Sequence, residues 1–260
     1  MNSIWVNRHL LVQMALREIV GRYKGSVIGL SWSFLHPLLM LAVYTFVFGV
    51  VFQARWQSSA THEDFALNLF AGLIVFSVFA EVINRAPGII LENTNYVKKV
   101  IFPLEILVPC TVISSLFHAV ISLFILLVFF MFVHGIPYWT VIWLPLIWLP
   151  FVLLILGFSW FLSALGVYLR DISQVIGVMV TAMMFLSPIF FPVSALPEVV
   201  RDWMFLNPLA LIIEQTRNAL LLGISPNWIA WSVYALVSLM VCMVGYLWFI
   251  KTRKGFADVL

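Results

Sequence analysis

Two charged side chains at helical spacing border an otherwise uncharged part of the chain. Glu81 and Arg85 are four residues apart, so on a helix they face each other and can form an ion pair. Such a pair either is a purely structural ion pair or transmits motion from the following loop to the helix. The histidines offer no metal site, because they are scattered and no two are four residues apart.

The sequence lacks the motifs of common nucleotide-binding and hydrolytic sites. It has no Gly-x-x-x-x-Gly-Lys-Ser/Thr, and therefore no phosphate-binding loop of its own. It has no Gly-x-Ser-x-Gly nucleophile turn, and the centres of its long apolar stretches carry no acid or base. A proton- or sodium-driven carrier usually needs such a group. We therefore expect a protein that catalyses no covalent reaction and itself binds no cofactor or metal.

Aromatic side chains make up 16% of the chain and recur at helical spacing. Such a stripe either packs one helix against another or lines a pore. A pore of this kind suits sugars, because the C–H faces of sugar rings stack on aromatic rings and a translocation path must hold its cargo weakly at many places. The residues that we consider for a pore lining are Tyr44, Phe48, Phe52, Phe76, Phe79 and Phe185.

The composition places these residues in a membrane protein. The chain has 260 residues, of which 63% are hydrophobic and 10% charged. Soluble proteins are about 45–50% apolar and about 25% charged. The composition excludes an ordinary soluble enzyme, a nucleic-acid-binding protein and a disordered tail, because too few polar groups are available to cover a soluble surface. The formal net charge of +3 is spread along the chain and forms no basic stripe.

Long stretches without Asp, Glu, Lys or Arg define the predicted membrane-spanning helices. Crossing the hydrocarbon layer takes about 20 apolar residues. The stretch between Glu105 and Arg170 is long enough for two spans, joined by a turn at residues 134–138 that contains Gly135 and Pro137. We predict an all-α protein with six spans, at about 33–53, 65–84, 107–133, 140–167, 172–190 and 229–250.

The basic residues in the short loops predict the orientation. With a cytoplasmic N-terminus, eleven basic side chains fall on the cytoplasmic side and three on the other. We therefore expect both termini in the cytoplasm. No signal peptide is expected, because no small-residue cleavage site follows the first span.

Residues 1–32 precede the first span and form a separate N-terminal segment. Trp5, Val12, Leu16, Ile19 and Tyr23 share one face at helical spacing, which predicts an amphipathic helix lying at the membrane interface. Apolar residues on its other side suggest that this helix also contacts protein, although a simple membrane anchor is the alternative. Residues 33–260 form the membrane domain.

Two connections outside the spans have unusual sequences. The cytoplasmic loop at about 85–105 should contain a short helix that ends before Pro103. This helix either docks another protein through Tyr96, Lys98 and Lys99 or belongs to a basic loop that only sets topology. The outer region at about 188–228 is apolar and rich in proline, which predicts two short re-entrant helices. A loop resting on lipid headgroups is the alternative.

A series of short motifs runs from about residue 15 to the C-terminus. They are residues 17–26, 29–32, 36–38, Glu81 with Arg85, residues 92–93, 97–107, 170–172, 187–189, 191–192, 196–197, 207–209 and 256–259. In their order and spacing these motifs resemble those of ABC-2-type polysaccharide export permeases. Within that family the chain looks most like lipopolysaccharide O-antigen export subunits, and Leu104 departs from the basic residue found in many members.

The resemblance implies the transmembrane half of an exporter. Two copies of the chain would form a channel above two copies of a separate ATPase, which would bind ATP and Mg²⁺. The loop at 85–105 would couple to that ATPase through Asn93, Asn95, Tyr96, Val97, Lys98, Lys99, Phe102, Pro103 and Glu105. The region at 188–228 would gate the outer mouth through Pro188, Phe191, Pro192, Pro197, Asn207 and Pro208.

The implied cargo is a polysaccharide linked to undecaprenyl diphosphate, moved across the bacterial inner membrane. From charge alone, Arg17, Arg22 and Lys24 could attract the diphosphate at the cytoplasmic rim, or they merely follow the orientation rule. The alternatives within the family are an exporter of capsule, teichoic acid or a small lipophilic compound. A secondary carrier is the alternative from another class.

Overall fold

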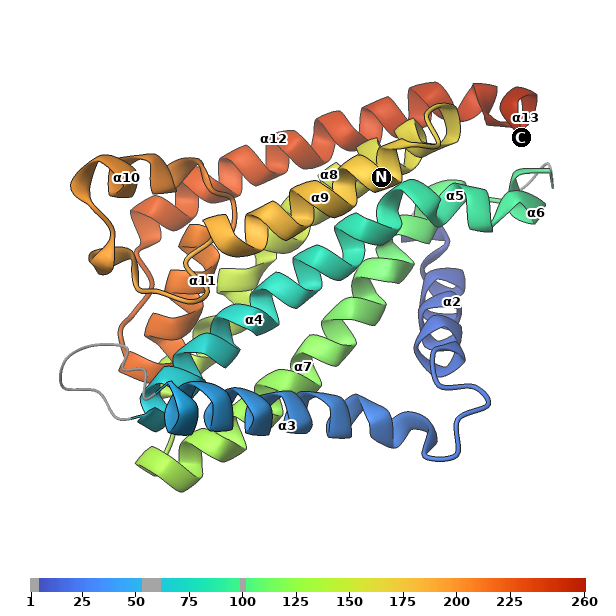
Figure 1. The fold of residues 1–260 in the computed structure, drawn as a ribbon. Coiled ribbons are helices and arrows are strands. Elements are labelled where there is room, and N and C mark those ends of the chain that lie inside the picture. Colours follow the sequence, from blue (N-terminus) through green and yellow to red (C-terminus); the bar gives the residue numbers. More distant parts are fainter. Residues whose placement is uncertain (1–4, 53–61, 99–101) are drawn as a thin grey trace.

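The described part of the chain folds into helices joined by turns (Figure 1). The structure is a computed structural model that describes residues 5–52, 62–98 and 102–260. The predicted all-α class is therefore confirmed for these residues, which contain no strand. The longer helices are α2 (Arg8–Gly21), α3 (Trp32–Tyr44), α4 (His62–Arg85), α7 (Leu107–His134), α8 (Leu144–Tyr168), α9 (Ile172–Leu186) and α12 (Trp228–Thr252).

Short helices lie between and beyond the long ones. The loop at about 85–105, predicted to be cytoplasmic, contains η3 (Ala86–Gly88), α5 (Ile89–Glu92), α6 (Thr94–Val97) and η4 (Leu104–Ile106). The region at about 188–228, predicted to lie on the outer side and named the outer region for that reason, contains η6 (Val193–Ala195), α10 (Glu198–Trp203), η7 (Met204–Leu206), α11 (Ala210–Arg217) and the π-helical turn η8 (Asn218–Leu222). The others are η1 (Gly29–Ser31), the π-helical η2 (Thr45–Val51), η5 (Trp139–Trp143), η9 (Arg253–Gly255) and α13 (Phe256–Val259).

Five helical runs among the described residues are long and apolar enough to cross a membrane. They are Gly29–Phe48, Asp64–Glu92, Leu104–His134, Trp139–Tyr168 and Trp228–Val259. The predicted turn between the third and fourth spans is present, because α7 ends at His134 and Gly135 follows with a φ of 88°.

The fifth predicted span is shorter than expected. Helix α9 ends at Leu186, so the predicted end at residue 190 is wrong. The physical reason is Pro188, which disfavours a helical conformation at the residue before it. Ser187 accordingly adopts an extended backbone, with φ −90° and ψ 151°. With 15 residues, α9 is shorter than the roughly 20 residues that usually cross a bilayer.

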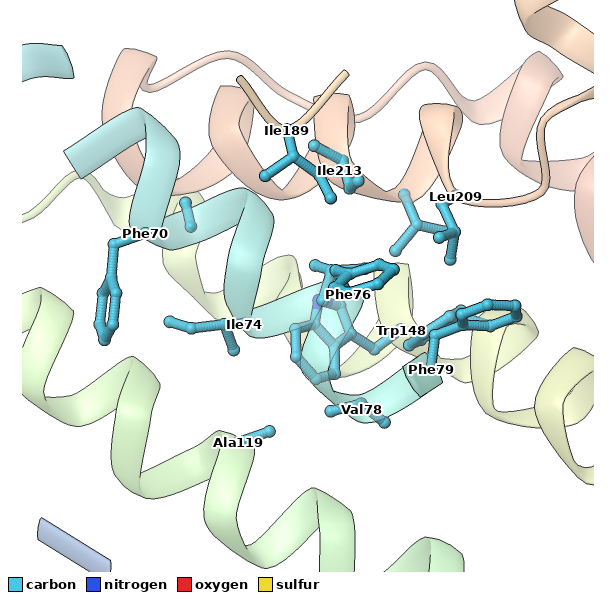
Figure 2. Close-up of a cluster of buried hydrophobic side chains, with 14 of the residues drawn as sticks. Phe70, Ile74, Phe76, Val78, Phe79, Ala119, Trp148, Ile189, Leu209 and Ile213 are labelled. Atoms are coloured by element: carbon cyan, nitrogen blue, oxygen red, sulfur yellow. The ribbon is translucent and has the colours of Figure 1, made fainter. Parts of the chain in front are cut away.

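Helix α4 is the central element of the fold. In the most apolar window of its run, 72% of the residues are buried, against 11% for the run that contains α3. Its apolar side chains pack against α7, α8, α9 and α11. Figure 2 shows part of this core, in which Phe76 and Phe79 lie close to Trp148 and Leu209.

Helices α8 and α12 lie side by side along much of their length. Glycines permit their close approach, as in other membrane helix pairs. A Cβ atom on Gly157 would lie 2.5 Å from the Val241 carbonyl oxygen, and one on Gly245 would collide with the Gly157 carbonyl oxygen. The backbones are therefore too close for any side chain at these positions.

Candidate functional site

The predicted ion pair on α4 is part of a larger network at the end of that helix. Glu81 and Arg85 do interact, at 3.8 Å between Oε1 and Nη1. Their closer partners lie on the N-terminal segment, where Glu18 and Arg22 have the same four-residue spacing. The Arg85 Nη1 atom lies 2.7 Å from Glu18 Oε1, and Arg22 pairs with Glu81. Two pairs of oppositely charged residues therefore join α2 and its C-terminal turn to α4.

The N-terminal helix is shorter than the segment predicted for it. It ends at Gly21, so Arg22, Tyr23 and Lys24 lie in the following turn. Ala15 and Ile19 are buried, and the helix packs on α7, whereas Val12 and Leu16 are exposed. The helix therefore has one side that faces protein and one exposed apolar side. Ile19 lies on the buried side, apart from Val12 and Leu16, with which it is predicted to share a face. The predicted position at the membrane interface stays a prediction.

The loop at 85–105 is stabilised by contacts of its own. Tyr96 stacks on Phe102, with ring centroids 4.3 Å apart. The Asn93 side chain donates to the Ile89 carbonyl oxygen at 2.8 Å, while Asn95 and Lys98 are exposed and Val97 and Pro103 are half-buried. Lys99 lies outside the described residues. This arrangement leaves Asn95 and Lys98 as accessible positions on the loop.

Glu105 has a different environment from the rest of the predicted docking residues. Its side chain is buried and pairs with Arg253, near the C-terminus, while its carbonyl oxygen accepts a hydrogen bond from Trp160 Nε1 at 3.1 Å. Glu105 therefore ties the loop to α8 and to the C-terminal segment, and it offers no exposed surface for a partner.

The three basic residues considered for attracting a diphosphate have different environments. The charge of Arg22 is compensated by Glu81. Arg17 and Lys24 are exposed, and no ion pair within the described ranges involves either of them. Arg17 lines a cavity of about 240 Å³ with Glu92 and Tyr96, between α2 and the loop at 85–105.

The aromatic residues considered for a pore fall into three groups. Tyr44, Phe48 and Phe52 form a continuous stripe, in which Phe48 also stacks on Phe65 with centroids 5.3 Å apart. Phe76 and Phe79 are buried within the fold, which favours the packing alternative for these two in this conformation (Figure 2). Phe185 is exposed near the end of α9 and stacks on Phe190.

The outer region is attached to the end of α9 by polar side chains. Asn207 donates to the Leu186 carbonyl oxygen at 3.1 Å and accepts from the Leu209 N–H at 2.9 Å. The Tyr234 hydroxyl on α12 donates to the Pro208 carbonyl oxygen at 2.8 Å. Pro188 is buried. Phe191 and Pro192 are half-buried and Pro197 is exposed, so the predicted gate residues extend from the core to the surface.

Arg217 is the main functional candidate that the sequence reasoning missed. Its guanidinium is buried and donates to three carbonyl oxygens: Asn68 at 2.8 Å, Pro188 at 2.5 Å and Ile189 at 2.7 Å. Gly72 provides the space, since a Cβ there would lie 2.6 Å from Arg217 Nη2. Burial lowers the pKa of Arg217 to about 9, so the side chain remains charged at neutral pH.

The signal that could have revealed Arg217 is its position. It is a single arginine before a long uncharged stretch, on the side that the orientation rule leaves poor in positive charge. Among the described residues, no group of three His, Cys, Asp or Glu side chains is placed to bind a metal ion.

Comparisons with known proteins match the chain to a family and to several named relatives. Residues 9–221 match the family described as ABC-2 type transporter. The chain is 28% identical over 213 residues to the O-antigen export system permease protein RfbA of Myxococcus xanthus, covering 81% of this chain and 80% of the relative. It is 26% identical over 253 residues to RfbA of Klebsiella pneumoniae, covering 96% and 95%. It is also 24% identical to the polysialic acid transport protein KpsM of Escherichia coli over 88% of both chains.

Proposed function

The chain belongs to the ABC-2 type transporter family, and from this premise we propose that it is the membrane subunit of a polysaccharide exporter. The observation that carries the proposal is its similarity, over nearly the full length of both chains, to an O-antigen export permease. Membrane-spanning helices without a phosphate-binding loop are consistent with a separate ATPase subunit.

The proposed assembly contains two copies of this chain and two ATPase subunits in the bacterial inner membrane. Both termini and the loop at 85–105 face the cytoplasm, in keeping with the basic residues on that side. In the proposed dimer a second copy would cover the exposed apolar face of α3, which in a single copy would lie against lipid. Helix α9 would complete six spans if the bilayer thins locally around it or the outer region enters the membrane.

The proposed cargo is an O-antigen-like polysaccharide linked to undecaprenyl diphosphate. The exposure of Arg17 and Lys24 supports a role for both in attracting the diphosphate, because their charges are accessible on the side proposed to be cytoplasmic. Replacing both by Gln should lower export several-fold, whereas Lys251→Gln, at an exposed basic residue on α12, should not. Unchanged export by a normally folded R17Q/K24Q variant would contradict this role.

A capsule-type polysaccharide is the second candidate cargo. The observation that favours it is the similarity to a polysialic acid transport protein, which is weaker than that to the O-antigen permeases. An exporter of teichoic acid or of a small lipophilic compound, and a secondary carrier, are the remaining alternatives, and no relative named above favours them.

Deletion of the gene in the source cells tests the proposal. We expect surface polysaccharide to disappear while the lipid-linked glycan accumulates on the cytoplasmic side, and the wild-type chain to restore export. Restoration should fail when the partner ATPase cannot hydrolyse ATP. Normal surface polysaccharide in the deletion strain would contradict the proposed cargo, and export without ATP hydrolysis would favour the secondary carrier.

A further inference from the structure

A polar cavity of about 400 Å³ lies among α3, α4, α7 and the turn that follows α2. Its volume is in the range of small-ligand sites, about 300–1,000 Å³. Helices α2 and α3 both pack against α7, and Figure 1 shows these three helices enclosing a triangular region. The cavity's lining includes Tyr23, Trp32, Glu81 and His118.

The cavity joins a charged pair at the ends of α2 and α4 to a histidine on α7, one of the helices long and apolar enough to cross a membrane. Polar groups within such helices are expensive unless they have partners. His118 is near the middle of α7, and Glu81 is near the end of α4. The Nδ1 atom of His118 lies 3.4 Å from the Tyr23 hydroxyl. Its Nε2 atom is buried and has no hydrogen-bond partner among the described residues. The wall of the cavity therefore holds a polar atom that is unsatisfied in this conformation, and a bound molecule could reach it only after the His118 ring turns.

The hydroxyl groups in the lining face the cavity as hydrogen-bond acceptors. A serine hydroxyl has one hydrogen to donate. Ser77 donates it to the Ile74 carbonyl oxygen at 2.8 Å, and Ser122 to the His118 carbonyl oxygen at 3.0 Å. Ser115 donates to Glu81 Oε2 at 3.2 Å, and Ser33 to the Leu30 carbonyl oxygen. Each of these oxygens therefore has only lone pairs left for a ligand.

The charges in the lining compensate each other. Arg22 pairs with Glu81, so neither a carboxylate nor a guanidinium is left uncompensated to balance a charged ligand. A phosphate carries acceptor oxygens and would face the serine lone pairs, while a cation would approach Arg22. An uncharged group with several O–H donors fits both the acceptors and the charge balance. Tyr23 and Trp32 add aromatic rings on which the C–H face of a sugar can stack.

We propose that this cavity is a sugar subsite, which binds an uncharged sugar residue next to the lipid of the cargo. This inference rests on the proposed function, because a lipid-linked glycan is the source of that sugar. It adds that the permease recognises its cargo through sugar hydroxyls as well as through the charge of the diphosphate.

The experiment uses the full-length chain in lipid nanodiscs and two probes: a polyprenyl diphosphate that carries one hexose, and the same polyprenyl diphosphate without sugar. Ser77→Ala with Ser122→Ala removes two acceptors whose hydrogen bonds lie within their own helices. Ala119→Leu fills the cavity without removing a polar group, because Ala119 lines it and is buried. Ser232→Ala is the matched control, since Ser232 donates to Trp228 O within α12 and is exposed.

We expect the wild type to bind the sugar-bearing probe more tightly than the bare lipid. S77A/S122A should weaken binding of the sugar-bearing probe about tenfold, as expected for two lost hydrogen bonds, and leave binding of the bare lipid unaffected. A119L should weaken binding of the sugar-bearing probe at least as much, because the larger side chain occupies the space of the sugar, and should also leave binding of the bare lipid unaffected. S232A should match the wild type. Wild-type binding of the sugar-bearing probe by a folded S77A/S122A variant would overturn the sugar subsite and leave a water-filled cavity. Failure of the wild type to bind either probe would contradict the proposed lipid-linked cargo itself.

Discussion

Arg217 is the residue on which the local structure of the outer region depends most. The chain leaves the helical conformation after Leu186, which exposes the carbonyl groups of the last turn of α9 and of the residues that follow. Two side chains from further along the chain donate hydrogen bonds to these carbonyl oxygens. Arg217 donates to those of Pro188 and Ile189, and Asn207 donates to that of Leu186. A buried carbonyl without a partner costs about 1–3 kcal/mol. These two side chains therefore fix where the outer region meets α9 and α4.

Replacing Arg217 should destabilise the chain strongly. Arg217→Gln replaces a guanidinium that donates to three carbonyl oxygens by a shorter amide with two hydrogens to donate, so at least one buried carbonyl loses its donor. We expect a loss of about 1–3 kcal/mol in the free energy of unfolding, measured by thermal or denaturant unfolding in detergent. Arg201→Gln is the control, because Arg201 also bonds two carbonyl oxygens, of Ser194 and Leu196, but is exposed. Equal stability of the two variants would show that the burial of Arg217 adds nothing to the free energy of unfolding.

The sequence predicts some of these residue contacts and not others. The pairing of Glu81 with Arg85 follows from helical spacing alone. The same spacing occurs in Glu18 and Arg22, but their pairing with α4 depends on how α2 docks, which no local pattern specifies. Arg217 was missed for the same reason. Its acceptors are 28 to 149 residues away in the sequence, and only the folded chain brings them together.

At the scale of elements, apolar length predicts the spans well and their ends less well. The predicted range 107–133 differs by one residue from the end of α7, because Gly135 stops that helix as expected. Helix α9 ends four residues before its predicted limit, because Pro188 acts on the residue before it. Apolar content alone does not locate such a break, since the residues on both sides of it are equally apolar.

The packing of α8 on α12 can be tested with a matched pair of glycine substitutions. Gly245→Ala should destabilise the chain by about 2 kcal/mol or more, because its Cβ would overlap the Gly157 carbonyl oxygen in a close backbone contact. Gly177→Ala on α9 meets nothing within 4 Å and should be neutral or slightly stabilising. Thermal unfolding of both variants measures the difference. A well-folded G245A variant with wild-type stability would contradict this helix packing.

The docking of α2 on α4 predicts an energetic coupling between the two elements. In a double-mutant cycle of Glu18→Gln and Arg85→Gln, we expect a coupling of about 0.5–1 kcal/mol, which is modest because both side chains are partly exposed. The coupling should weaken at high salt. Strictly additive effects of the two substitutions would mean that the N-terminal helix is not held by this ion pair.

At the scale of the whole molecule, burial is distributed unevenly. Helix α4 is enclosed, while α3 and much of α12 present apolar side chains outward. The described fold is therefore a membrane domain whose outer helices need lipid or a second copy as neighbours. Composition and hydropathy predict the membrane class. They do not predict which helix becomes the centre, because α4 and α7 are both apolar and only their packing distinguishes them.

The central claim is that this chain works with a separate ATPase, and purification from the source cells in mild detergent tests it most directly. We predict that an ATPase co-purifies with the tagged chain in a roughly equimolar amount. Replacing Asn95 and Lys98, which are exposed on the loop at 85–105, should release it, while Lys251→Gln should not. A folded, monodisperse sample without any ATPase would contradict the claim and favour a carrier with another energy source.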